Sequence, residues 1–352
     1  MIFVGVDAHK KVHVAMALDE AGQEIGEWSG PNSAAGWQSL SLWAAALSTS
    51  RIWGIEGAWS YGRGLAQQLV AEGETVYEIN ARWTALGRRR ARRPGKTDRL
   101  DARAVALFVR QEAPGLPKVA AEDATAVLDL LTTEREAALA EATRLRNQIH
   151  ALLLQLDPEY KARFPNLRSR TTLTRLEKYT PVGKGPLPAQ RAAAVRRLAK
   201  RLRLALSQAD ELAREIEANV ADFAPLTRLC GVNLLTAGSL AGILGPGRRF
   251  SSDAQLAAYA GVAPLEASSA GLVRHRLNRG GNRRLNTVLY RIALTQAHHL
   301  PAARDYLERR VTEGKTRREA RRALTRYIVR AVWRLWQECT PVAAGLRLDE
   351  AA

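Results

Sequence analysis

The sequence contains little cysteine and little histidine, and this scarcity excludes two classes of protein. Its 352 residues include two cysteines and six histidines. The cysteines, Cys230 and Cys339, are far apart, and neither they nor the histidines have the short spacing of metal ligands. We therefore expect neither a disulfide-stabilised secreted fold nor a structural zinc site, but reduced thiols in a cytosolic protein.

Long apolar runs are also missing. A membrane-spanning helix needs about 20 consecutive apolar residues, and no stretch of this chain provides them. The first stretch, MIFVGVDAHKKVHVAMALDE, has charges in its middle and no cleavage site, so it does not resemble a signal peptide. We expect no membrane partner.

Acidic residues are too few to balance the basic ones. Lys and Arg number 53 against 35 Asp and Glu, which gives a formal net charge of +18. Such an excess favours polyanionic partners, nucleic acid first and an anionic membrane second. The plainer interpretation is a solvated basic surface produced by a GC-rich genome. Apolar residues make up 46% of the chain, enough for at least one hydrophobic core.

Residues 1–118 carry alternating strand and helix patterns, which predict an α/β domain. Helical periodicity covers residues 34–47, residues 62–71 and the segment that begins near Asp98. The short apolar runs that are typical of strands are MIFVGVD, VHVAMAL, QEIGEW, RIWGIEG and TVYEIN.

Residues 119–225 predict a long helical coiled-coil middle. Apolar residues recur with heptad spacing in residues 122–157 and again from Leu198 to about Phe223. A stretch rich in Pro and Gly, residues 179–188, lies between them and is typical of a loop. The two patterns predict either an antiparallel hairpin within one chain or a coiled coil that joins two copies.

Residues 226–352 predict a mainly α-helical domain. Residues 226–245 have the form helix, short glycine turn, helix, which is similar to helix-hairpin-helix modules whose turn offers backbone N–H groups to DNA phosphates. We also expect a short helix within residues 253–264. Two amphipathic helices with arginine-rich outer faces are expected at residues 282–299 and 316–338.

Four acids stand at places where an α/β fold brings side chains together. Asp7 and Glu56 end strand-like runs, and strand ends converge on one rim of such a sheet. Asp98 and Asp101 are three residues apart, so a helix places both on one face. Four clustered carboxylates repel each other unless cations are present, and hard oxygen ligands select Mg²⁺ or Mn²⁺. Two such ions can clamp a phosphodiester.

Each acid also has a purely structural interpretation. Asp7 and Glu56 suit strand-end turns, Asp98 suits a helix N-cap, and Asp101 suits the positive end of the helix dipole. The combination is more specific than its members. An acid after the first strand, an acid after a later strand and a D-x-x-D pair on the last helix have the order found in RNase H-like, RuvC-like nuclease domains.

Two further segments suggest contact with phosphate. The stretch APLEASSAGLVRHRLNRGGN has no regular period, and a serine on such a loop can attack phosphorus if arginines hold the phosphate. A loop serine more often only caps a turn. The arginines near this segment are Arg274, Arg276, Arg279, Arg283 and Arg284. A second basic cluster, Arg88, Arg89, Arg90, Arg92 and Arg93, lies before the paired aspartates and predicts either an electrostatic track for nucleic acid or a plain exposed loop.

Several of these stretches together resemble a known family. GVDAHKKVHVAMAL, GIEGAWSYG, RRRARRPGKTDRLDARAVA and the serine segment with its sequel RGGNRRL are similar to the DEDD transposases of the insertion-sequence-110 family. The resemblance covers residues 1–112 and 226–300. It implies that Asp7, Glu56, Asp98 and Asp101 form the metal-binding tetrad. It also implies a nucleophilic serine at Ser268, with Ser269 as the runner-up because Ala270 replaces the usual glycine.

The resemblance further implies a function. The protein would be a transposase of a bacterial insertion sequence that cuts and rejoins DNA with Mg²⁺ (or Mn²⁺) and a phosphoserine intermediate, without ATP. Donor and target DNA would be selected by a structured non-coding bridge RNA, and sites would be shared within a dimer or tetramer. The expected location is the cytoplasm, at the nucleoid. The alternatives are a structure-specific nuclease that uses water and a non-catalytic nucleic-acid-binding protein.

Overall fold

The computed structural model describes residues 1–80, 97–246, 249–266, 275–276, 278 and 280–339. It divides into two compact units. The first consists of Met1–Ala126, Asp222–Val232 and Ile243–Ala352, and the second of Val127–Ala221 and Asn233–Gly242. Among the described residues, no helix is long and apolar enough to cross a membrane.

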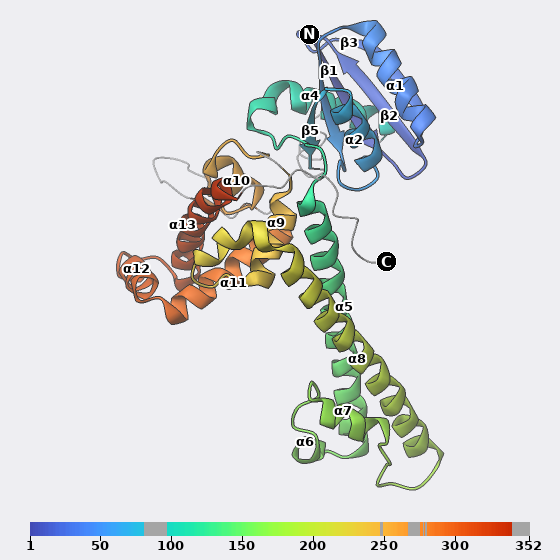
Figure 1. Ribbon diagram of the computed structural model, residues 1–352, viewed down its shortest axis with the longest axis vertical. Helices are drawn as coiled ribbons and strands as arrows, with labels where there is room; N and C mark the ends of the chain where they lie inside the picture. Colours follow the sequence, from blue (N-terminus) through green and yellow to red (C-terminus); the bar gives the residue numbers. More distant parts are fainter. Residues whose placement is uncertain (81–96, 247–248, 267–274, 277, 279, 340–352) are drawn as a thin grey trace. The chain divides into compact units, whose positions relative to one another are not determined.

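A mixed five-stranded sheet forms the centre of residues 1–118, as the strand-like runs predict (Figure 1). Its order is β3-β2-β1-β4-β5, in which β1, β2 and β3 form an antiparallel meander and β1, β4 and β5 are parallel. The strands are β1 (Ile2–Ala8), β2 (Val12–Leu18), β3 (Glu24–Pro31), β4 (Arg51–Glu56) and β5 (Thr75–Ile79). The sequence prediction of an α/β arrangement here is confirmed.

Helices cover both faces of this sheet. One face carries α1 (Ala34–Leu47) and α2 (Arg63–Ala71), whose leucines pack against Val4, Val6 and Ile55. The other face carries α4 (Asp98–Glu112), which contacts β1, β2, β4 and β5. Because side chains alternate along a strand, even-numbered residues of β1 face α1 and α2, and odd-numbered residues face α4.

Two glycines allow α4 to lie directly on the strands. A Cβ atom added to Gly5 would lie 2.2 Å from the backbone nitrogen of Ala106, closer than any real contact. A Cβ atom on Gly54 would lie 3.0 Å from Cβ of Val109. The close packing brings the first turn of α4, with its two aspartates, to the end of β1.

The remaining part of the first unit is helical. It contains α10 (Asp253–Tyr259), α11 (Arg283–His299), α12 (Pro301–Thr312) and α13 (Arg317–Glu338), and α13 contacts the other three. Helix α12 was not predicted. The residues before α11, which show no strand period, nevertheless form a two-residue ladder between β6 (Leu265–Glu266) and β7 (His275–Arg276).

The expected helix-hairpin-helix element is present only in outline. Its first helix is a 3₁₀-helix, Ala221–Arg228, and its second is α9 (Leu234–Leu244). Pro225 lies inside the first segment and removes a backbone donor, which explains why no α-helix forms there. The turn between them contains Gly231 with a φ of +91°, a conformation that favours glycine.

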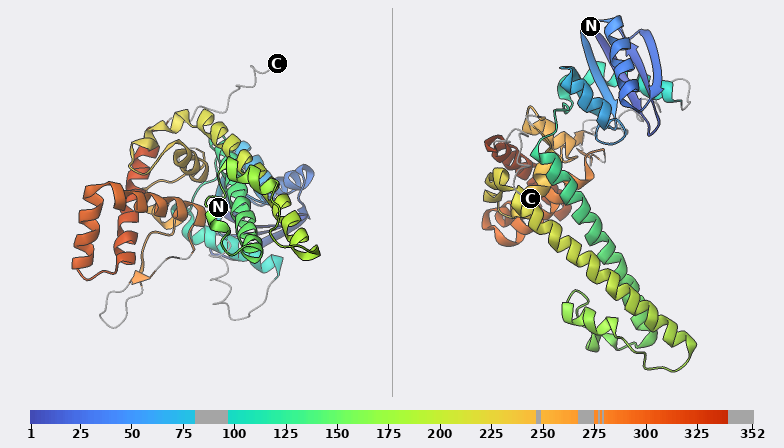
Figure 2. Two further views of the ribbon diagram at one scale, coloured as in Figure 1. Left: turned by 90° about the horizontal axis from the view of Figure 1, so that it is seen from below. Right: turned by 45° about the vertical axis from the view of Figure 1, so that its right-hand side comes forward.

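The second unit is a helical hairpin. Helices α5 (Ala124–Leu156) and α8 (Pro186–Asn219) lie side by side (Figures 1 and 2). They share one core with α6 (Tyr160–Arg163) and α7 (Arg170–Glu177), and this core contains Ile149 and Leu202. The heptad patterns therefore pair within one chain. Helix α8 begins at Pro186, inside the stretch predicted as a loop, because proline fits the first turn of a helix.

Candidate active site

Asp7 and Glu56 are neighbours across two parallel strands. Asp7 is the penultimate residue of β1, Glu56 is the last residue of β4, and their Cα atoms are partners in the strand register. Both lie two residues beyond a glycine that contacts α4, so both side chains belong to the sheet face that α4 covers. Asp7 is buried and Glu56 is half-buried.

Helix α4 brings the other two acids to this edge. Asp98 and Asp101 occupy its first turn. The N-cap is Thr97, whose hydroxyl accepts a hydrogen bond from the Leu100 backbone N–H at 3.2 Å, so Asp98 is not the capping residue. Asp101 is 5% exposed, whereas the Asp98 side chain is 58% exposed. One acid of the pair is therefore inside the fold and the other faces solvent.

The pKa of Asp7 is influenced by the acids around it. Burial raises the pKa of the Asp7 carboxyl above its usual value, and the negative charges of Asp101 and Glu56 raise it further. His9 opposes them and lowers this pKa. A carboxylate held among like charges in a buried place gains stability when a cation binds.

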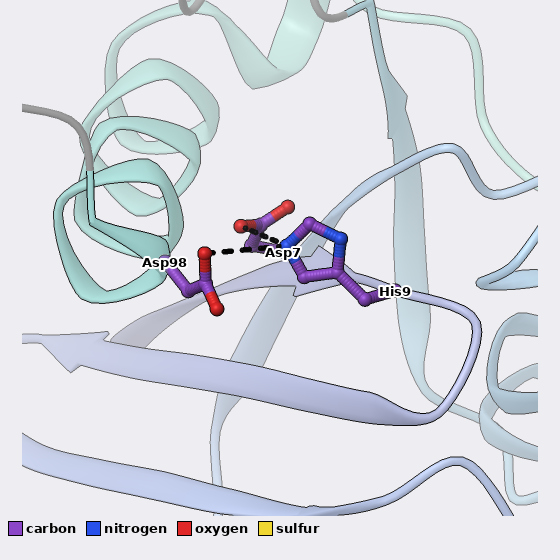
Figure 3. A group of neighbouring side chains, drawn as sticks. All are labelled: Asp7, His9 and Asp98. Carbon is purple, nitrogen blue, oxygen red and sulfur yellow. Dashed lines mark hydrogen bonds and ion pairs between the residues drawn. The ribbon is translucent and has the colours of Figure 1, made fainter.

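His9 completes the group, and sequence analysis did not predict it. Its Nε2 atom lies 3.0 Å from Oδ2 of Asp7 and 3.5 Å from Oδ1 of Asp98 (Figure 3). The available signal was its place two residues after Asp7, directly after the same strand. A search for clustered histidines misses it because its companions are carboxylates.

The geometry fits a divalent cation. One ligand atom each from Asp7, His9 and Asp98 lie within 4.8 Å of one another. Carboxylate oxygens suit Mg²⁺ and Mn²⁺, and an imidazole nitrogen suits the softer transition metals. Asp101 and Glu56 raise the pKa of Asp7 and therefore lie near it, but the ligand atoms within 4.8 Å of one another belong to Asp7, His9 and Asp98.

The predicted serine segment lies mostly outside the described residues. This is so for Ser268, Ser269, Arg274, Arg279 and the basic cluster Arg88–Arg93. Arg276 belongs to strand β7. Arg283 and Arg284 open α11, whose N-cap Asn282 accepts a hydrogen bond from the Leu285 backbone N–H at 3.0 Å. The first turn of this helix thus presents two guanidinium groups.

A buried arginine, also missed in the sequence, joins the sheet to the start of α11. The guanidinium of Arg249 forms an ion pair with Glu78 of β5 and donates a hydrogen bond to the Tyr259 hydroxyl at 3.2 Å. The same hydroxyl accepts a hydrogen bond from the Asn282 side chain at 2.9 Å. Asn80, just after β5, donates to the Gly280 carbonyl at 3.4 Å. The residues that flank the serine segment are therefore bonded to the sheet that carries Asp7.

Comparison with known proteins identifies the family. A model of IS110 DEDD transposases matches residues 4–158, and a model of the IS116/IS110/IS902 transposase family matches residues 224–308. The chain belongs to the IS110 family of transposases. Both matched regions contain predicted site residues: the first includes all four acids and His9, and the second includes the serine segment.

Relatives of this IS110-family chain match over nearly its whole length. The insertion element IS110 43.6 kDa protein of Streptomyces coelicolor is 27% identical over 96% of this chain and 95% of its own. The insertion element IS116 44.8 kDa protein of Streptomyces clavuligerus is 25% identical over the same shares of both chains. A putative transposase of Sinorhizobium fredii is 27% identical over 85% of this chain and 77% of its own. As a transposase, the protein is a DNA-recombining enzyme, and DNA is its partner.

Proposed function

We propose that this transposase cuts and rejoins DNA strands at a centre that combines a divalent metal with a serine nucleophile. The observation that carries the proposal is the register of Asp7 with Glu56, over which α4 places Asp98 and Asp101. This arrangement supports an RNase H-like, RuvC-like domain in residues 1–118. We propose the helical middle, residues 119–225, and the serine-bearing domain, residues 226–352, as the other parts.

The acids and His9 have separate roles in this proposal. Asp7, Asp98 and His9 hold the cation, Mg²⁺ or Mn²⁺, and Glu56 and Asp101 add the negative charge that favours its binding. When bound, the cation would act as a Lewis acid and stabilise the negative charge on the reacting phosphodiester. The imidazole of His9 keeps both carboxylates in place before the cation arrives.

Ser268 supplies the nucleophile. Its hydroxyl loses a proton, Oγ forms a bond to phosphorus, and the bond from phosphorus to the 3′ oxygen breaks, so that a free 3′-hydroxyl leaves. The 3′-hydroxyl of another strand then attacks the phosphoserine and releases the serine. The number of phosphoester bonds is conserved, which removes the need for ATP. Arg276, Arg283 and Arg284 follow this segment in the sequence and would hold the phosphate.

A structured non-coding RNA selects the DNA in this proposal. The support is the net charge of +18, which suits polyanions, together with membership of this family. The protein would recognise the RNA by shape and backbone. Donor and target DNA would be brought together by a dimer or tetramer at the nucleoid in the cytoplasm.

The test is the capture of a covalent adduct. Purified protein is incubated with its guide RNA, labelled donor DNA and Mg²⁺, and the products are separated on a denaturing gel. We expect a protein–DNA adduct with the wild type and with Ser269→Ala, and none with Ser268→Ala or Asp7→Asn. A water-using nuclease predicts the contrary result, cleavage by Ser268→Ala without any adduct.

A further inference from the structure

A cavity of about 1000 Å³ lies within the C-terminal helices, apart from the acid cluster. It is lined by the three helices α11, α12 and α13 and by the residues between α10 and β6. All of these elements belong to the first compact unit. The proposed chemistry at Asp7 uses none of its lining residues.

Positive charge dominates the lining. Seven of the described lining residues are Lys or Arg, and one, Glu319, is acidic. The carboxylate of Glu319 is engaged at the start of α13, where it accepts hydrogen bonds from the Thr316 backbone N–H at 2.9 Å and its hydroxyl at 2.7 Å. The basic residues are Arg310, Lys315, Arg318, Arg321, Arg322, Arg326 and Arg330.

Part of this charge has no ion-pair partner among the described residues. Arg326 and Arg330 share Asp253 at 2.9 and 3.3 Å, and Arg310 pairs with Glu313 at 2.7 Å. Arg322 pairs with Glu319 at 3.8 Å. In the described part of the chain, no carboxylate lies within 4.0 Å of the charged groups of the remaining three, Lys315, Arg318 and Arg321. Lys315 and Arg318 are also exposed, so both can meet an anion from solvent.

Three tyrosines accompany these cations. The Tyr306 and Tyr327 rings meet edge to face with centroids 5.3 Å apart, and Tyr290 holds Arg321 both at its hydroxyl, at 2.9 Å, and over its ring, at 5.6 Å. Tyr327 is 51% exposed and Tyr290 is 44% exposed. Exposed aromatic rings beside cations are the pattern that binds bases and phosphates of single strands.

We propose that this cavity binds a single-stranded segment of nucleic acid, with phosphates on Lys315 and Arg318 and a base against Tyr327. An acidic peptide would use the cations but would gain nothing from the tyrosine rings. The inference rests on the proposed function, since the strand it binds is the guide RNA or the DNA named there, but the binding itself requires neither the metal nor the serine.

The cavity is lined by residues that lie on both sides of the serine segment in the sequence. Pro264, just before β6, and Asn278, just after β7, both line the cavity. They bracket the segment that contains Ser268 and Ser269. A strand bound in the cavity would therefore lie beside the residues at both ends of the serine segment.

The test is binding of labelled oligonucleotides by the full-length protein in EDTA. EDTA removes divalent cations, so metal-dependent cleavage does not occur. Fluorescence anisotropy is measured with oligo-uridine and oligo-thymidine of about 12 nucleotides, a length within the range of single-strand sites. We expect the double variant Lys315→Glu/Arg318→Glu to bind at least tenfold more weakly. The slope of log affinity against log salt should fall by about 1.4, because two phosphate contacts are lost.

A matched control makes the same change in net charge elsewhere. Arg304→Glu/Arg334→Glu alters two exposed arginines outside the cavity, and this variant should bind much more strongly than the cavity variant. For the ring, Tyr327→Leu should weaken binding about tenfold, and Tyr327→Phe should not. Preference for uridine or for thymidine supports the site and tells whether guide RNA or DNA occupies it. Equal binding by the two charge variants, or equal competition by polyglutamate, would overturn the proposal.

Discussion

The Nε2 atom of His9 lies 3.0 Å from Oδ2 of Asp7, at the end of β1. The carboxylate is buried, and the imidazole is about half exposed. In the absence of a cation, this contact partly offsets the repulsion between Asp7 and the neighbouring acids. The same nitrogen can also coordinate a metal that Asp98 shares.

His9→Ala should therefore weaken both metal binding and strand exchange. Removing a residue that orients metal ligands lowers affinity or activity by about 10–100-fold. His9→Gln should recover part of the loss, because its amide can reach the same carboxylates. Mn²⁺ binding by titration calorimetry and adduct formation on gels measure the two effects. The control His298→Ala changes an exposed histidine of α11, and a similar loss in that variant would refute a specific role of His9.

Gly5→Ala should displace α4 from the sheet. The new Cβ atom would lie 2.2 Å from backbone nitrogen of Ala106 and 2.3 Å from the Ala102 carbonyl oxygen, and helix backbone cannot yield as a side chain can. Overpacking of this kind costs roughly 1–3 kcal/mol or more. Urea denaturation measures the free energy of unfolding, and gel assays measure the activity of any folded fraction.

Gly115→Ala is the matched control. A Cβ atom at Gly115 meets nothing within 4 Å, and its φ lies outside the range that favours glycine. We expect its stability to differ from that of the wild type by about 0.5 kcal/mol or less. If Gly5→Ala were as mild as this control, the direct packing of α4 on β1 would be wrong.

The strands and helices around the acids were predictable because their periodicity is local. All five strands of the sheet and helices α1, α2 and α4 follow apolar patterns visible in the sequence. The meeting of Asp7 with Asp101 was inferred from the order of elements, since strand ends and a covering helix converge in such folds. Local pattern and common topology together thus predicted the acid cluster.

Other features depend on contacts that no local pattern contains. Arg249 looks like one more basic residue in the sequence, yet its charge is buried against Glu78, far along the chain. His9 has no histidine partner to mark it. The start of α8 was missed because Pro186 and Pro188 suggest a loop, although proline is well tolerated in a first helical turn.

The hairpin should lose stability below neutral pH because of His150. Burial lowers the pKa of this imidazole, and the charges of Lys161 and Arg146 lower it further. The unfolded chain then binds a proton near pH 6.5 while the folded state stays neutral, so stability is present above this value and declines as pH falls below it. Nδ1 of His150 also lies 2.7 Å from the Tyr160 hydroxyl, a contact that protonation of that nitrogen would alter.

Circular dichroism melts of wild type and His150→Gln at several pH values between about 5 and 8 measure this contribution. Gln keeps a polar group within reach of Tyr160 but does not titrate. We expect the two proteins to converge or cross as pH falls, with the wild type losing more. Parallel curves would contradict the assignment of the lowered pKa to His150.

Breaking the ion pair of Arg249 and Glu78 should destabilise the first unit and also weaken the connection between the sheet and the start of α11. The guanidinium lies over the rings of Trp59, Phe250 and Tyr259 at 5.3, 5.3 and 4.9 Å, so neither water nor another acid can replace Glu78 easily. Removing one partner of a buried pair costs about 3–5 kcal/mol, because the other charge remains buried.

Glu78→Met should therefore lower the free energy of unfolding by about that amount, whereas Glu78→Met/Arg249→Met should recover most of it, since no charge is then buried. Urea denaturation measures both. The double variant separates stability from positioning: it should fold, yet Tyr259 and Asn282 no longer connect to the sheet through Arg249. We expect it to bind DNA normally and to form the serine adduct at least tenfold more slowly. If adduct formation stayed at the wild-type rate, the connection would only stabilise the fold, without aligning the serine segment with the acids.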